Sequence, residues 1–131
     1  MSTDTRVYDV NELARYTGLP YDFKNHNCWQ FVRRVRADYN LSTPEFDCTH
    51  PDLSDSVFIA AHDNSKGLEQ IHFPERLCAV LMMKIIMGRE VWHSGVYIDG
   101  MVSHCDRYAR QVRLDSLESL SEQCERVEFW R

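Results

Sequence analysis

The stretch that decides the fold is "VWHSGVYIDGMVSHCD", residues 91–106. Asp99-Gly100 is a preferred two-residue turn of β-hairpins, and residues with high strand propensity flank it on both sides. The stretch therefore predicts an antiparallel hairpin. A two-residue turn also fixes the register, which pairs Ile98 with Met101 and continues outward one residue at a time.

The predicted register gathers polar side chains on one face of the hairpin. It places Gly95 opposite His104 and His93 opposite Asp106, and side chains alternate along each strand, so all four share a face. His93 and His104 become diagonal neighbours, about 7–8 Å apart at the backbone, and Gly95 leaves the space between their rings open. We therefore expect a histidine base, His93, that is oriented by His104 or, in the alternative, by Asp106. The competing interpretation is that His93 is structural, as most single strand histidines are.

A second stretch, "NHNCWQFVRRVR" at residues 25–36, predicts a helix that begins at Cys28. The apolar positions at helical spacing are Cys28, Phe31, Val32, Val35 and Tyr39. Arg33, Arg34 and Arg36 fall on or near the opposite side. A cysteine at a helix N-terminus lies at the positive end of the macrodipole, and this position and a nearby imidazole both lower its pKa. Cys28 is therefore a candidate nucleophile, and the alternative is an inert core cysteine.

The remaining segments complete an α+β pattern. Residues 9–20 and 52–67 predict helices, each ended by glycine. The apolar residues 77–85 predict a buried strand, with a buried helix as the alternative. Residues 110–117 and 125–131 each predict a strand. Helices followed by antiparallel strands indicate an α+β fold, and the length of 131 residues fits a single domain, 1–131.

Composition excludes several function classes. A formal net charge of −5 argues against a nucleic-acid-binding surface. The longest apolar run is too short to span a membrane, and the N-terminus lacks a signal peptide, so we expect a soluble protein made in the cytoplasm. Five cysteines without regular spacing do not indicate a disulfide framework. A zinc protein is an alternative, but the Cys and His spacings fit zinc poorly, so we expect neither metal nor cofactor.

These motifs resemble those of the NlpC/P60 cysteine peptidases, most closely phage-tail and prophage cell-wall peptidases. "NCWQFVRRVRADYNLSTPEF" at residues 27–46 is similar to the segment in which a Cys-Trp pair opens the nucleophile helix. "HSGVYIDGMVSH" at 93–104 resembles the family's His-x-Gly-hydrophobic-Tyr strand, tight turn and second histidine. "VEFWR" at 127–131 resembles the aromatic-Arg end of many phage members. The likeness covers most of the chain from about Tyr21 onward.

The resemblance implies a papain-like fold, in which the nucleophile helix packs on a small antiparallel sheet that carries the base. By the resemblance, Cys28 is the nucleophile, His93 the base, His104 the residue that orients it, and Tyr21 lies near the substrate cleft. The implied reaction is hydrolysis of an amide bond in peptidoglycan stem peptides. The implied partners are those peptides and phage tail-tip proteins, with action on the cell wall as part of a virion tail. Two alternatives remain: a catalytically inactive tail-assembly module and a cell-wall amidase toxin.

Overall fold

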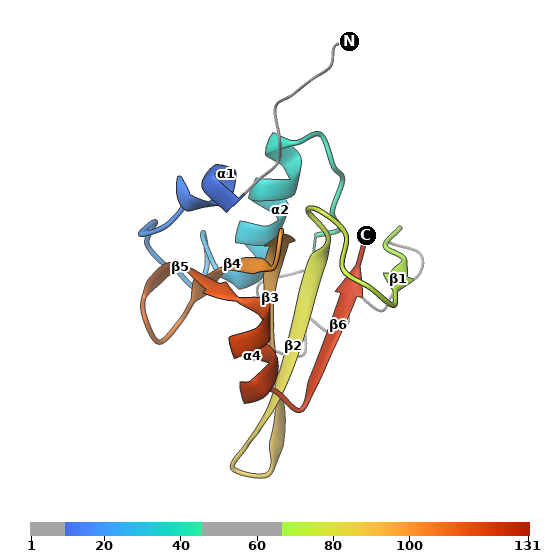
Figure 1. The fold of residues 1–131 in the computed structure, drawn as a ribbon. Coiled ribbons are helices and arrows are strands. Elements are labelled where there is room, and N and C mark those ends of the chain that lie inside the picture. The colour runs from blue at the N-terminus through green and yellow to red at the C-terminus, as the bar shows by residue number, and fades with distance from the viewer. Residues whose placement is uncertain (1–9, 46–66) are drawn as a thin grey trace.

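The computed structural model describes residues 10–45 and 67–131. It combines helices with a six-stranded antiparallel sheet of strand order β1-β6-β2-β3-β4-β5, so the predicted α+β class is confirmed (Figure 1). The helices are α1 (Val10–Ala14), α2 (Cys28–Asp38) and α4 (Leu117–Gln123). The strands are β1 (Gln70–Ile71), β2 (Ala79–Ile86), β3 (Arg89–Ile98), β4 (Met101–Asp106), β5 (Gln111–Ser116) and β6 (Arg126–Trp130). The helix expected over 52–67 lies, apart from its last residue, outside the described residues.

The predicted hairpin forms as β3 and β4. Its pairs are Ile98 with Met101, Tyr97 with Val102 and Val96 with Ser103, as the Asp-Gly turn requires. Both turn residues, at positions 99 and 100, have positive φ, of 47° and 87°. This is the conformation of a type I′ turn.

The β3–β4 ladder is shorter than we predicted. It ends at Val96–Ser103, so the expected pairing of His93 with Asp106 does not form. The ladder between β2 and β3 continues to Ile86–Arg89. Strands β2 and β3 therefore extend beyond the rest of the sheet as a two-stranded arm (Figure 1).

The apolar segment at 77–85 forms the central strand β2, so the strand prediction is confirmed and the helix alternative is wrong. From Ala79 to Met83 its side chains are buried on both faces of the sheet, whereas Lys84, Ile85 and Ile86 are exposed. Leu81 and Met83 belong to one core cluster, and Val80 and Met82 belong to the other. A strand covered on both faces reads as a continuous apolar run without alternation. This explains why periodicity could not distinguish it from a buried helix.

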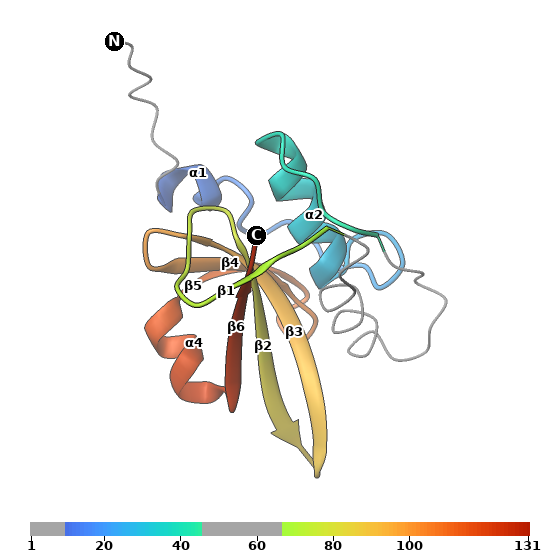
Figure 2. The ribbon, with the colours of Figure 1, turned by 90° about the vertical axis from the view of Figure 1, so that its right-hand side faces the viewer.

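Two helices cover opposite faces of the sheet (Figures 1 and 2). Residues of α2 share a core cluster with Leu81, Val96 and other residues of one face. Leu120 of α4 shares the second cluster with the other face. Helix α4 was not predicted, because the sequence was interpreted as a strand up to residue 117. None of the helices in the described ranges is long and apolar enough to cross a membrane.

Helix α2 follows the predicted stripe with two corrections. The predicted apolar positions 28, 31, 32 and 35 are buried, but Tyr39 is the C-cap residue and only half-buried. Arg36, predicted on or near the opposite side, is buried and 4% exposed. Arg36 Nε donates to Thr43 Oγ1 at 2.8 Å, and Nη1 donates to the Leu77 carbonyl oxygen at 2.6 Å. Position 36 continues the four-residue spacing of 28 and 32, so it belongs beside the buried stripe. The guanidinium there joins the helix by a hydrogen bond to the segment that precedes β2.

Candidate active site

Cys28 occupies the first turn of α2, and the residue before it fixes the helix start. Asn27 Oδ1 accepts hydrogen bonds from the backbone N–H groups of Trp29 and Gln30, at 3.1 and 2.9 Å. Gln30 Oε1 accepts from the Asn27 N–H at 2.9 Å, which completes a capping box. The thiol of Cys28 is therefore held at a defined helix N-terminus, as predicted, and it is 3% exposed.

Cys28 and His93 both line one cavity. Alternation along β3 directs Ser94 toward α2 and His93 toward the other face. Strands β3 and β4 no longer pair beyond Val96–Ser103. A cavity of about 600 Å³ lies there, and Cys28, His93 and His104 all line it.

The thiol's immediate neighbours belong to the strands that separate. Cys28 interacts with Ser94 of β3 and electrostatically with Cys105 of β4. Within the described part of the chain, no hydrogen bond joins the Cys28 thiol to His93. The two groups thus share a cavity, and no hydrogen bond among the described residues joins them.

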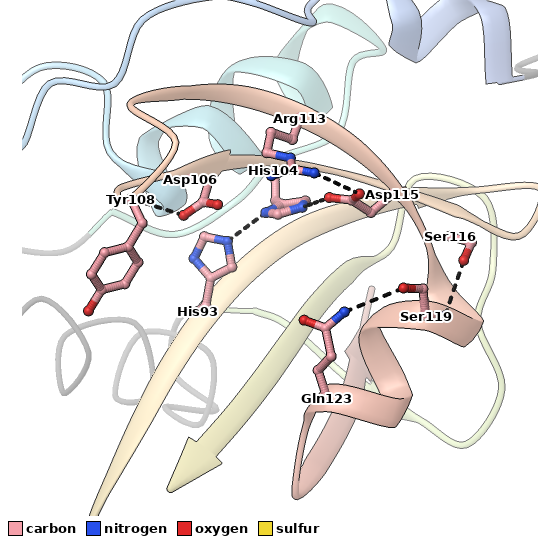
Figure 3. Close-up of polar contacts among 9 residues, drawn as sticks. All are labelled: His93, His104, Asp106, Tyr108, Arg113, Asp115, Ser116, Ser119 and Gln123. Atoms are coloured by element: carbon pink, nitrogen blue, oxygen red, sulfur yellow. Dashed lines mark hydrogen bonds and ion pairs between the residues drawn. The ribbon is translucent and has the colours of Figure 1, made fainter. Parts of the chain in front are cut away.

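A row of three side chains runs from β3 through β4 to β5 (Figure 3). His93 Nε2 lies 2.9 Å from His104 Nδ1, and His104 Nε2 lies 2.8 Å from Asp115 Oδ2. The two rings are nearly perpendicular, at 80°. The predicted hydrogen bond between His93 and His104 is therefore confirmed. Gly95 is what permits it, because a Cβ there would lie 3.1 Å from His104 Cβ and 2.6 Å from Val102 Cγ1.

If His104 is neutral, the row determines where the protons lie on both rings. A carboxylate only accepts hydrogen bonds, so a neutral His104 carries its proton on Nε2, facing Asp115. His104 Nδ1 must then accept, and the donor is His93 Nε2–H. The remaining nitrogen of His93, Nδ1, keeps its lone pair and lies on the side of the ring away from His104 (Figure 3). An unprotonated nitrogen on a held imidazole is what a general base needs.

Asp115 was missed by the sequence analysis, and Asp106 is not the orienting residue. Asp106 Oδ1 instead accepts from the Tyr108 backbone N–H at 3.0 Å. Asp115 lies opposite Val102, one diagonal step from His104 on the same face. The signal was an acidic residue within a predicted strand, but the pairing of that strand with β4 was not predicted.

The predicted lowering of the Cys28 pKa is wrong. Burial raises the pKa of the Cys28 thiol, and this effect is larger than the opposing ones. Ser94 and the backbone N–H groups of Trp29 and Cys28 do favour the thiolate, as expected at a helix start. Ser94 Oγ, however, completes no regular hydrogen bond. The resting thiol is therefore neutral at pH 7.

His93 is neutral as well. Burial, followed by the charges of His104 and Lys84, lowers the pKa of His93 to about 3. Burial disfavours the charged form of both an acid and a base, so it raises the pKa of the thiol and lowers the pKa of the imidazole. The site at rest holds an uncharged thiol and an uncharged imidazole.

Tyr21 lines the same cavity, as predicted for a residue near the cleft. Its hydroxyl is buried and has no hydrogen-bond partner among the described residues. Burial, together with the charge of Cys28, raises the pKa of Tyr21 to about 12. The hydroxyl is a neutral donor beside the thiol.

Comparison with known proteins adds no assignment. No protein-family model matches the chain, and no curated protein matches it. Across residues 10–45 and 67–131, no three His, Cys, Asp or Glu side chains are arranged so that they could hold a metal ion.

Proposed function

We propose that the protein is a cysteine peptidase with a papain-like NlpC/P60 fold that hydrolyses amide bonds of peptidoglycan stem peptides. The observation that supports this most strongly is the His93–His104–Asp115 row, which ends at the cavity that Cys28 also lines. A nucleophile, a base and an orienting group are the minimum that covalent acyl transfer requires. The choice of substrate rests on the resemblance of the Cys28 helix and the His93 hairpin to that family.

The first chemical step is attack by Cys28 sulfur on the substrate carbonyl carbon. The thiol proton passes to His93 Nδ1 as the S–C bond forms, because both groups start uncharged. The imidazolium is then stabilised through His104 by the Asp115 carboxylate. His93 returns the proton to the leaving amine, and the C–N bond breaks to give a thioester. Water, deprotonated by His93, then releases the acid product and restores the thiol.

Backbone geometry supplies a candidate oxyanion donor. The cap on α2 uses the N–H groups of Trp29 and Gln30, and the Phe31 N–H donates to the Asn27 carbonyl at 3.0 Å. The Cys28 N–H has no such role, and it lies at the helix N-terminus, where negative charge is favoured. The Tyr21 hydroxyl offers a second donor for the substrate. A direct contact between the thiol and His93 forms with substrate present, as catalytic contacts in free enzymes are commonly longer.

The test is digestion of purified sacculi by the wild type and by Cys28→Ala, with mass analysis of the released fragments. We expect peptide fragments from the wild type and none from Cys28→Ala. Cys78→Ala is the matched control, because Cys78 is a buried cysteine that does not line this cavity and has no role in the row. It should release fragments as the wild type does.

Equal release by the wild type and Cys28→Ala would end the peptidase proposal. No release by either protein, from sacculi of several bacteria, would favour the inactive tail-assembly module. Release that survives in Cys78→Ala but not in Cys28→Ala supports a peptidase, either of a virion tail or of a toxin that acts on the cell wall.

A further inference from the structure

The cavity extends past His93 into a groove between the β2–β3 arm and α4. The residues that line this part are Met82, Lys84, Ile86, Val91, Leu120, Gln123 and Cys124. Most of them are apolar, and Lys84 is a cation among them. Figure 3 shows Gln123 on α4, the helix that follows β5, and Gln123 lines the cavity together with His93.

The sheet register places Lys84 beside the proposed base. His93 pairs directly with Met82, and Lys84 is the next residue of β2 on the same face. Lys84 is therefore the diagonal neighbour of His93, within reach of a long side chain. Its charge contributes to the lowered pKa of His93, as expected for an ammonium group nearby.

Within residues 10–45 and 67–131, Lys84 has no carboxylate partner. Among the described residues no Asp or Glu forms an ion pair with its ammonium group, whereas Arg113, another cation of the cavity, contacts Asp115 at 3.5 Å. An unpaired cation beside a base lowers that base's affinity for protons, so Lys84 makes His93 a weaker base as long as no anion is bound. A bound anion would remove that effect.

We propose that Lys84 binds a carboxylate of the substrate, on the amine side of the bond that is cleaved. This inference rests on the proposed function. His93 must reach the leaving nitrogen, so the amine fragment lies over His93. Lys84 lies on β2, on the side of His93 away from β4, whereas the Cys28 thiol interacts with Cys105 of β4. The substrate class is thus an acidic peptide whose carboxylate belongs to the leaving fragment.

The bound carboxylate also acts on the chemistry. It neutralises Lys84 and makes protonation of His93 easier, so it favours transfer of the thiol proton. A substrate without that carboxylate binds less well and leaves His93 a poorer base. Lys84 is thus a binding residue that couples substrate recognition to the basicity of His93.

The experiment uses two synthetic stem peptides that differ only in the carboxyl group of the amine-side residue, which is free in one and a carboxamide in the other. For the wild type we expect kcat/KM to favour the free acid about two- to fivefold, as an exposed ion pair provides. Lys84→Gln should cleave both peptides at the same rate. The matched control Lys24→Gln alters an exposed lysine that does not line the cavity, and it should keep the preference.

A binding measurement separates this inference from the proposed function. NMR titration of the full chain carrying Cys28→Ala, with and without Lys84→Gln, detects binding without turnover. We expect the free acid to bind about two- to fivefold more tightly than the carboxamide only when Lys84 is present, since about this much is typical of such a pair. Binding that depends on Lys84 without any cleavage by the wild type would overturn the peptidase and keep the carboxylate site. Two results would overturn the carboxylate site alone. In one, Lys84→Gln cleaves the peptides and still prefers the free acid; in the other, the wild type cleaves both peptides without a preference.

Discussion

Replacing Asp115 by Asn tests the row of side chains directly. Asp115 Oδ2 accepts from His104 Nε2 at 2.8 Å, and His104 is 4% exposed, so water cannot replace the lost partner. The Asn side chain is uncharged, and its NH₂ group can face His104, which would move the His104 proton to Nδ1. His104 could then no longer accept from His93. A buried hydrogen bond to a charged group contributes roughly 1.5–3 kcal/mol, so we expect kcat to fall about 10- to 150-fold.

The assay is cleavage of stem peptides by Asp115→Asn, compared with Asp106→Asn as the control. Asp106 is the acidic residue that the hairpin register also allowed, but its carboxylate accepts from the Tyr108 backbone N–H and does not contact either histidine. Asp106→Asn should therefore keep kcat within about threefold of the wild type, since changes away from such networks are usually small. The reasoning is refuted if Asp106→Asn loses the larger share of kcat while Asp115→Asn keeps it.

Two further predictions concern stability. The pKa of His93 is about 3 in the folded protein and 6.5 in the unfolded chain, so only the unfolded chain binds this proton between those values. The contribution of His93 to the free energy of unfolding is therefore fully present above pH 6.5 and falls on acidification by up to about 1.4 kcal/mol per pH unit. Urea unfolding at pH 7 and pH 5 should show this slope in the wild type and a shallower one in His93→Gln; identical slopes would contradict it. Gly95→Ala places a Cβ 2.9 Å from the Ser103 carbonyl oxygen and 3.1 Å from His104 Cβ, and overpacking of this kind costs about 1–3 kcal/mol. A urea midpoint equal to that of the wild type would show that the strands separate enough to accept the methyl group.

The hairpin was predictable because one local signal determined it. Asp99-Gly100 sets the turn, the turn sets the register, and the register brings His93 and His104 together with Gly95 between them. The start of α2 was predictable for a similar reason, since apolar spacing and the polar lead-in agree at Cys28. Both features depend on residues close together in the sequence.

The remaining features depend on contacts between distant segments. Asp115 reaches His104 only because β5 pairs with β4 in one register, and nothing in the β5 sequence states that register. Arg36 is buried because Thr43 and the Leu77 carbonyl satisfy its guanidinium, and Leu77 is 41 residues away. Helix α4 begins directly after β5, where Ser116 caps it by accepting from the Ser119 N–H. Propensity alone did not separate that helix from the strand before it.

The Cys28 pKa shows how a correct local argument can give a wrong result. The helix start does favour the thiolate, but burial outweighs it. The same burial keeps His93 neutral, so the free protein stores no thiolate–imidazolium pair. A substrate carboxylate at Lys84 then has a defined task, because it lowers the cost of charging His93 at the moment the thiol gives up its proton. The Cys28 thiol of such a protein reacts slowly with small neutral alkylating agents. It reacts faster when the amine product that carries the free carboxylate, here called the free-acid product, is bound. Iodoacetamide labelling of Cys28, with and without that product, measures the difference, and labelling that is already fast in the free protein would show that the thiolate exists at rest.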